Sequence, residues 1–232
     1  MQSVAQVWER LLFGTGGALA IQKCFNYLVH WKWTPHGFPF LTSVTDNPTT
    51  LLQMTSGRST SSTTIPRVET SIGKRTLVVR LAPDGSFTQE FAHRQEQAIT
   101  WVRNITNAPL TRDEVYTAYC SMWRPSFEYP LPITCFSKQQ CCILQKTFTG
   151  PFLSKMGISS KTSRKLIFAP YRYSGFAFAD IWVQQGLQHL QLLIGHLCHQ
   201  DQVENLLQIN IDTLQLLLGH PLPPPYSTLT RI

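Results

Sequence analysis

The chain has 232 residues, of which 43% are hydrophobic and only 14% are charged, and its formal net charge is +7. No run reaches the ~20 apolar residues of a membrane helix, and Glu9 and Arg10 stand where a signal peptide has an apolar core. We therefore expect an intracellular protein of the nucleus or cytoplasm, with no membrane partner and with mostly reduced cysteines. The basic charge suits RNA or DNA as a partner, and it equally fits a basic protein without one.

The beginning of the chain predicts one helix and a hairpin. Apolar residues recur at helical spacing over residues 3–13, and the glycine-rich residues 14–17 end that helix. Residues 18–33 are rich in aromatic and β-branched side chains, which favour a strand. A turn at Pro35-His36-Gly37 then leads into residues 38–44 as the returning strand of a hairpin.

The next segments are less regular. Residues 45–64 consist mostly of Thr, Ser, Asn and Gly, so we expect a loop or linker with at most one weak strand. Arg75–Leu81 reads as a single clear strand, followed by a turn at Pro83-Asp84-Gly85.

From residue 87 onwards the pattern is helical. A first helix is predicted over about 87–107, and a second over 111–124, opened by a capping box of Thr111 and Glu114. Pro125 should end the second helix, because proline disfavours helical geometry in the residue before it. Residues 125–132 are then expected to be extended.

Three more helices complete the prediction. Ser137 and Gln140 form a capping box for a helix over 137–156, which Gly150-Pro151 should kink or split. A basic loop over 157–179 follows. Asp180 can cap a helix to about residue 200, whose apolar stripe contains Val183, Leu187, Leu190, Ile194 and Leu197, and a short last helix covers about 212–218.

These segments predict an α+β protein. Residues 1–82 form a small N-terminal α/β piece with a Ser/Thr-rich linker, residues 83–220 a mainly helical bundle, and residues 221–232 a disordered, proline-rich tail.

The sequence offers little for catalysis. No Gly-x-Ser-x-Gly elbow is present, and the carboxylates are scattered rather than paired for metal-dependent phosphoryl transfer. Six cysteines with His196 and His199 give only a weak zinc signal, and core or surface cysteines explain them better. We predict no cofactor, no bound metal and no small-molecule substrate for this chain.

Basic residues are the strongest functional signal. Arg75 lies in the predicted strand, and a second group surrounds a Ser/Thr-rich loop close to Tyr171 and Tyr173. Cations mixed with aromatic rings can bind phosphates and stack on bases, although a solvated loop would have the same composition. The candidate nucleic-acid contacts in this second group are Lys155, Lys161, Arg164, Lys165 and Arg172.

Five motifs in order resemble the end of the palm and the thumb of a non-LTR (LINE-like) retrotransposon reverse transcriptase. The stretch from Gly16-Gly17 to Lys23-Cys24 is similar to the fourth polymerase motif, and the hairpin at Pro35-His36-Gly37 to the primer-grip hairpin. The other three are Arg75-Thr76-Leu77-Val78-Val79, the series Arg94, Tyr116 and Pro125–Tyr129, and the late turn Tyr173–Asp180. The resemblance covers roughly residues 3–218.

The resemblance implies RNA-directed DNA polymerisation for the intact family enzyme, with two Mg²⁺ ions held by palm aspartates that precede the first motif. We therefore expect this chain to be a fragment that is inactive alone and retains at most template or primer binding. Lys23 corresponds to a lysine near the incoming nucleotide, and it becomes a further candidate contact. Val78, Ser174 and Ala177 replace glycines of the family pattern.

Two alternatives stay open. One is a helical protein-interaction module, and the other is a relic without function.

Overall fold

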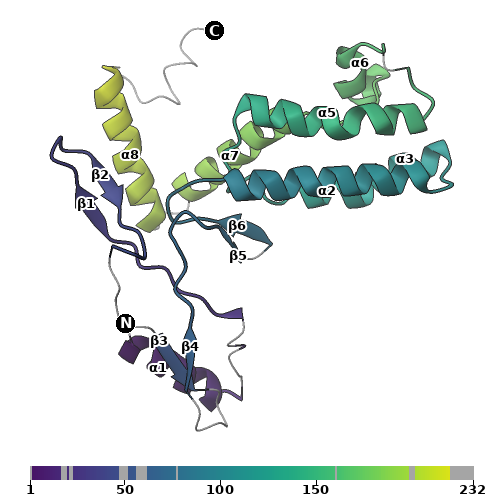
Figure 1. Ribbon diagram of the computed structural model, residues 1–232. Helices are drawn as coiled ribbons and strands as arrows, with labels where there is room; N and C mark the ends of the chain where they lie inside the picture. The colour runs from purple at the N-terminus through teal and green to yellow at the C-terminus, as the bar shows by residue number, and fades with distance from the viewer. Residues whose placement is uncertain are drawn as a thin grey trace. The chain divides into compact units, whose positions relative to one another are not determined.

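The computed structural model describes residues 2–16, 20, 23–46, 52–55, 62–76, 78–159, 161–198 and 202–219 (Figure 1). The chain divides into two compact units, Met1–Ala92 and His93–Ile232. The first unit contains a helix and short antiparallel hairpins, and the second unit is helical. The predicted α+β class is confirmed. The proline-rich tail over 221–232 lies outside the described residues.

The predicted N-terminal helix and first hairpin are confirmed. Helix α1 spans Gln2–Gly14. Strands β1 (Trp31–Trp33) and β2 (Pro39–Leu41) pair antiparallel, with Trp31 opposite Leu41. Gly37 closes the turn between them with φ +79°, a conformation that glycine adopts without a steric penalty.

The long strand predicted over 18–33 is wrong in its described part. Only β1 is a strand there, and the preceding described residues 23–30 hold one isolated bridge, between Asn26 and Arg67. The Tyr27 hydroxyl gives a physical reason, because it donates to the Ile72 carbonyl at 2.7 Å and accepts from the Lys74 amide at 3.0 Å. This segment is therefore held by scattered contacts rather than by a ladder.

The Ser/Thr-rich linker predicted over 45–64 holds two strands instead of at most one. Strands β3 (Leu52–Thr55) and β4 (Ser62–Ile65) pair antiparallel, and α1 packs against β3. Met54 and Ile65 are both buried. Their burial explains the hairpin, because two apolar side chains are enough to fix which face of a short ladder points inward.

The single strand predicted over Arg75–Leu81 is a tight hairpin. Strands β5 (Lys74–Thr76) and β6 (Val79–Leu81) pair antiparallel, with Thr76 opposite Val79. The chain reverses at Val78, whose φ is +79°. A β-branched residue in this conformation is rare, so sequence propensity pointed to a continuous strand.

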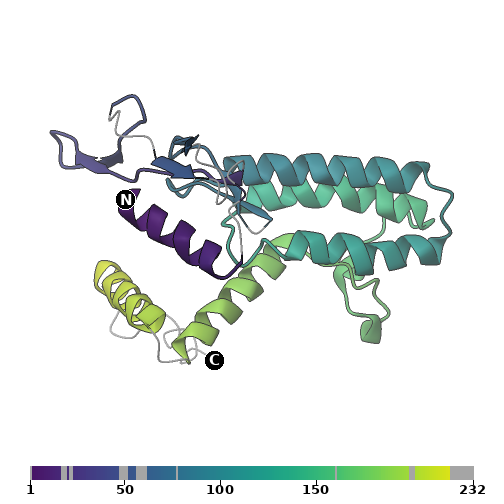
Figure 2. The ribbon, with the colours of Figure 1, turned by 90° about the horizontal axis from the view of Figure 1, so that it is seen from below.

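The second unit is built on three helical rods that lie side by side (Figure 2). Helix α2 spans Thr88–Asn107 and α5 spans Lys138–Lys155, which confirms both predictions. The third rod runs through α3 (Arg112–Ala118), the π-helical turn η2 (Tyr119–Trp123) and α4 (Arg124–Glu128). Helix α5 continues through Pro151 as one element, so the predicted split is wrong.

The third rod corrects the prediction that Pro125 ends a helix. The Arg124 amide donates to the Tyr119 carbonyl in the π pattern, and Pro125 then falls in the first turn of α4, where its missing N–H costs little. Residues 125–128 are therefore helical and not extended. The buried residues of this rod, Val115, Tyr119, Trp123 and Phe127, recur every four positions.

Aromatic side chains form the core of the bundle. The ring of Trp123 stacks on Phe127 with centroids 4.2 Å apart and lies 4.7 Å from Phe148 of α5. Tyr119 lies 4.4 Å from Phe178. Burying such rings stabilises a small domain strongly, by roughly 1.5–3 kcal/mol for each large apolar side chain.

The remaining helices partly follow the prediction. Helix α7 (Ile181–Leu197) begins where expected, because the Asp180 carboxylate accepts from the Val183 amide at 3.1 Å. Helix α8 (Gln202–Leu218) is much longer than the predicted 212–218, and it ends before Gly219. The loop predicted over 157–179 also contains helix α6 (Arg164–Phe168) and the 3-10 turn η3 (Tyr171–Tyr173).

Candidate nucleic-acid interface

The predicted contact residues divide between the two units. Lys23 and Arg75 are both exposed in the first unit. Arg75 lies opposite Arg80 in the β5–β6 hairpin. Most of the glycine–lysine motif that precedes Lys23 lies outside the described residues. The other five predicted residues belong to the second unit, where they lie on α5, α6, η3 and the connections between them.

Lys155 is tied to the bundle. It lies in the last turn of α5, and its Nζ donates to the Thr106 carbonyl near the end of α2 at 3.1 Å. A cation at the end of two helices satisfies carbonyl groups that lack partners within the helix. This lysine therefore has a structural use of its own.

Arg172 lies against an aromatic ring. Its guanidinium carbon lies 4.8 Å from the centroid of the Tyr173 ring, a cation–π distance. Tyr171 and Tyr173 are both well exposed. Exposed rings beside a cation are typical of surfaces that bind single-stranded nucleic acid.

Helix α6 carries Arg164 and Lys165, and the chain that follows holds it in place. The Phe176 amide donates to the Leu166 carbonyl and the Phe178 amide to the Ile167 carbonyl, each at 3.0 Å. Gly175 packs so closely on Ala169 that an added Cβ would lie 2.0 Å from the Ala169 carbonyl oxygen. The helix is thus fixed although it has only one turn of its own.

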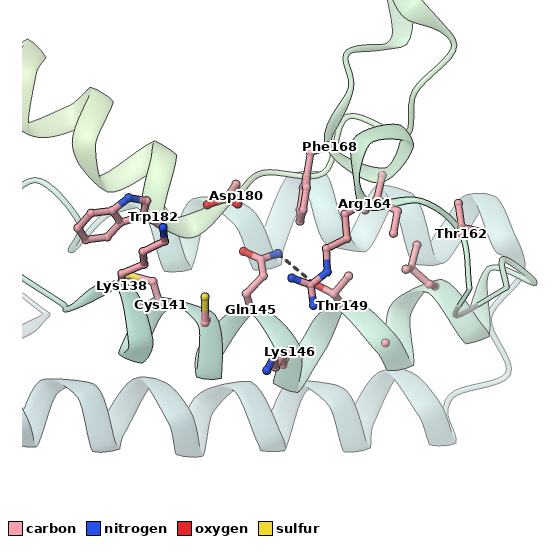
Figure 3. Close-up of a pocket in the computed structure, with 14 residues that line it drawn as sticks. Lys138, Cys141, Gln145, Lys146, Thr149, Thr162, Arg164, Phe168, Asp180 and Trp182 are labelled. Carbon is pink, nitrogen blue, oxygen red and sulfur yellow. Dashed lines mark hydrogen bonds between the residues drawn. The ribbon is translucent and has the colours of Figure 1, made fainter.

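Between α5, α6 and the start of α7 lies a pocket of about 280 Å³ (Figure 3). Arg164 and Phe168 reach into it from α6, and Trp182 lines it from α7. Two lysines of α5, Lys138 and Lys146, also line it. The complete lining is Lys138, Cys141, Cys142, Gln145, Lys146, Thr149, Gly150, Leu153, Thr162, Arg164, Ile167, Phe168, Asp180 and Trp182.

Gln145 connects the walls of this pocket. Its Oε1 accepts from the Ile181 amide at 2.9 Å. Its Nε2 donates to the Thr149 hydroxyl at 3.0 Å, the bond that Figure 3 marks with a dashed line. Burial raises the pKa of the Cys141 thiol to about 11, so the thiol stays neutral at physiological pH. Cys141 and Gln145 therefore add no charge to the lining, whose charged residues are Lys138, Lys146, Arg164 and Asp180.

Sequence reasoning found Arg164 and missed the two lysines of the pocket. A signal was present, because Lys138, Cys142, Lys146 and Thr149 are spaced 4-4-3 and so share one face of α5. Lys161 and Lys165 are exposed, and neither lines the pocket.

The basic residues are also unevenly distributed. The chain has no lysine or arginine between Arg172 and Arg231, whereas Asp180, Asp201, Glu204 and Asp212 fall in this stretch. Helices α7 and α8 therefore carry no lysine or arginine to attract phosphate groups, and among the described residues the lysines and arginines that can do so all lie at or before Arg172.

Within the described residues, no group of three or more His, Cys, Asp or Glu side chains is arranged to hold a metal ion. None of the helices that the structure describes is both long and apolar enough to cross a membrane. Comparisons with protein-family models, with curated proteins and with solved structures find no match.

Proposed function

We propose that this chain is a segment of a reverse transcriptase of the non-LTR retrotransposon class, covering the end of the palm and the thumb, and that it binds nucleic acid. The observation that carries the proposal is a coincidence of backbone geometry. Among the described residues, the non-glycine positions with positive φ are Val78, Ser174 and Ala177. These are the three positions named above at which this chain replaces a glycine of the family pattern.

The coincidence has a physical meaning. Side chains with a Cβ avoid positive φ at a cost of roughly 1–2 kcal/mol, whereas glycine does not. A pattern that places glycine at these three positions therefore matches the backbone that this chain adopts. Gly175, a glycine that the chain keeps, is also the position where a Cβ would meet the Ala169 carbonyl.

Contacts between the resembling motifs add support. The Arg94 guanidinium is buried and donates to the Ser126 carbonyl at 3.3 Å, so two members of the thumb-like series touch. Tyr116 of the same series lies 6.3 Å from Phe178 of the late turn, measured between ring centroids. The thumb-like series and the late turn thus pack together although they are far apart in sequence.

The binding surface proposed for nucleic acid consists of Lys161, Arg164, Lys165 and Arg172 with Tyr171 and Tyr173. Four cations within one short segment suit a phosphate backbone, and the exposed tyrosines suit bases. The ligand is RNA, DNA or their hybrid. The proposal assigns no catalytic step and no Mg²⁺ site to the chain itself, so it expects no templated extension by the purified chain.

The test measures the anisotropy of a labelled RNA–DNA hybrid over a salt series from ~50 to ~200 mM, where phosphate contacts lower affinity steeply. In a variant with Lys161, Arg164, Lys165 and Arg172 all changed to Gln, the salt slope should fall by roughly 0.7–0.9 for each lost contact. Arg103→Gln, an exposed change on α2, is the matched control and should keep the slope. An unchanged slope in the fourfold variant would overturn the proposal, as would absent binding by a chain that melts cooperatively.

A second function, protein docking, is favoured by the face of α7. Four apolar residues of its predicted stripe, Val183, Leu187, Leu190 and Ile194, are between 48% and 58% exposed rather than buried. Helix α8 adds Leu206 and Ile209, both 61% exposed. An apolar face of this extent on a helix is typical of a binding surface.

The charged residues of α7 and α8 indicate which kind of partner fits this apolar face. Because Asp212 lies on α8 and neither α7 nor α8 carries a lysine or arginine, the fitting partner is an amphipathic helix with basic flanks. A model Leu/Lys amphipathic peptide is the probe. Leu187→Gln and Leu190→Gln should weaken its binding about tenfold, and Gln191→Ala, on the same exposed helix, should not. Equal binding by all three variants, or concentration-dependent dimers without the peptide, would contradict this docking mode.

A further inference from the structure

We infer that the pocket between α5, α6 and α7 binds one unpaired nucleotide, and so distinguishes single strands from duplexes. This inference rests on the nucleic-acid binding proposed above and names the form of nucleic acid that the site takes. The pocket shares Arg164 with the surface of cations around α6, and its other residues, among them Lys138, Phe168 and Trp182, do not belong to that surface.

The lining combines the two chemistries of a nucleotide. Figure 3 shows Trp182 with Lys138 at one end of the pocket, and Phe168 with Arg164 at the other. An aromatic side chain offers a surface on which a base can stack, and a neighbouring cation can pair with its phosphate. Such a pair at each end lets one nucleotide use an aromatic contact and an ionic contact together.

Simpler ligands fit less well. A small hydrated anion would lose its water against Leu153, Ile167 and the neutral Cys141 thiol without gaining partners there. A purely apolar ligand would leave Lys138 and Arg164 without an anion. A ligand with a flat ring and a negative group satisfies both parts of the lining.

The size and the one carboxylate in the lining restrict how the nucleotide lies. The cavity of about 280 Å³ is close to the lower end of the range for small-molecule pockets, so it holds one base and not a base pair. Asp180, which caps α7 through the Val183 amide, repels phosphate from the middle of the pocket. The phosphate must therefore lie toward Arg164 or Lys138 at the ends.

Cys142 provides a local probe. It is an exposed cysteine that lines this pocket, whereas Cys135 and Cys198 are exposed cysteines outside it. The experiment follows iodoacetamide modification of each cysteine in the full chain by mass spectrometry. The three ligands are a single-stranded oligodeoxynucleotide, a blunt RNA–DNA hybrid and free adenosine monophosphate.

The expected result is selective protection. At a concentration of single strand about ten times its Kd, modification of Cys142 should slow roughly tenfold, and modification of Cys135 and Cys198 should be unchanged. The blunt hybrid should protect Cys142 much less. Protection by adenosine monophosphate would show that a free nucleotide suffices, and protection only by the oligonucleotide would show that the site needs a strand. Either pattern supports the inference.

Two variants complete the test. Phe168→Ala should remove the protection and weaken single-strand binding roughly tenfold, while hybrid binding at the α6 surface persists. Because Phe168 is half-buried, Trp182→Ala at an exposed position repeats the test if the first variant does not fold. Single-strand binding that protects Cys142 no more than Cys135, while the hybrid still binds, would overturn the pocket inference alone. Absent binding of every ligand would instead overturn the proposed function.

Discussion

The backbone amide of Ala179 donates a hydrogen bond to the phenolic oxygen of Tyr119, with an N···O distance of 2.8 Å. Tyr119 begins the π-helical turn of the third rod and is only 1% exposed, and Ala179 lies just before α7. One side chain thus joins the core of the bundle to the entry of a helix 60 residues later.

The first prediction removes this bond. Tyr119→Phe should lower the free energy of unfolding by about 1–3 kcal/mol, because it leaves the Ala179 amide without its partner. Urea denaturation measures the change. Tyr129→Phe is the control at an exposed position and should stay within about 0.5 kcal/mol of wild type. Equal stabilities of Tyr119→Phe and wild type would mean that water replaces the phenol without loss.

Tyr119 also predicts a pH dependence. Burial raises the pKa of its hydroxyl to about 12, whereas an unfolded tyrosine titrates near ~10. Between these values the unfolded state loses the proton first, so stability is complete below pH ~10 and falls as the pH rises toward ~12. The full difference is about 2–3 kcal/mol. Urea midpoints followed above pH ~8 should fall less steeply in Tyr119→Phe than in wild type, and parallel curves would refute the assignment.

The second prediction concerns backbone strain. Ala177 has φ +51°, so Ala177→Gly should raise the free energy of unfolding by about 1 kcal/mol, since glycine adopts this conformation without strain. The same exchange within α2, Ala92→Gly, should lower it by about 1 kcal/mol. Thermal melts of the two variants would then move in opposite directions. A downward shift for both would mean that the strain at Ala177 is negligible.

The third prediction uses two glycines of the second unit. Gly175→Ala should cost at least ~2 kcal/mol, because the new Cβ would overlap the Ala169 carbonyl oxygen. Gly186→Ala in α7 meets no atom within 4 Å and should stabilise the protein by up to ~1 kcal/mol. Chemical denaturation measures both changes. A Gly175→Ala variant as stable as wild type would show that Ala169 at the end of α6 can move away from the new Cβ.

The fourth prediction tests the cap of α5. The Ser137 hydroxyl accepts from the Gln140 backbone amide at 3.2 Å, and the Ser137 amide donates to the Gln140 Oε1 at 2.8 Å. Ser137→Ala should therefore cost about 1 kcal/mol of stability. Ser154→Ala, an exposed change in the last turn of α5, serves as its control. If Ser137→Ala and Ser154→Ala are equally stable, the cap contributes nothing measurable to the free energy of unfolding.

Sequence reasoning succeeded where one residue's own chemistry decides the structure. Thr111, Ser137 and Asp180 each begin a helix at the predicted place, because a side-chain oxygen pairs with backbone amides only a few residues away. Gly157 ends α5 with φ +72°, and the Ile158 amide bonds the Leu153 carbonyl in the expected cap. Such signals are local, so the sequence contains them in full.

It failed where distant packing overrides local preference. Pro125 stays inside a helical rod because a π turn precedes it, and the buried Trp123 and Phe127 keep that rod continuous. Val78 has a positive φ in a turn, a conformation that β-branched residues rarely adopt. In the candidate site, Arg164 was found from its loop. The spacing on α5 places Lys138 on one face of that helix, but only the tertiary arrangement of α5 and α6 brings it to one pocket with Arg164.

The stretch without lysine or arginine after Arg172 has a practical consequence for handling the protein. Trypsin cleaves only after these residues, so digestion should release α7 and α8 together as one peptide, from Tyr173 to Arg231. Amine-reactive cross-linkers and lysine-directed modification, including ubiquitin attachment, find no side-chain target on this peptide. A partner held there would escape a lysine-based cross-linking survey and would be captured by carboxylate-directed or photoreactive reagents instead.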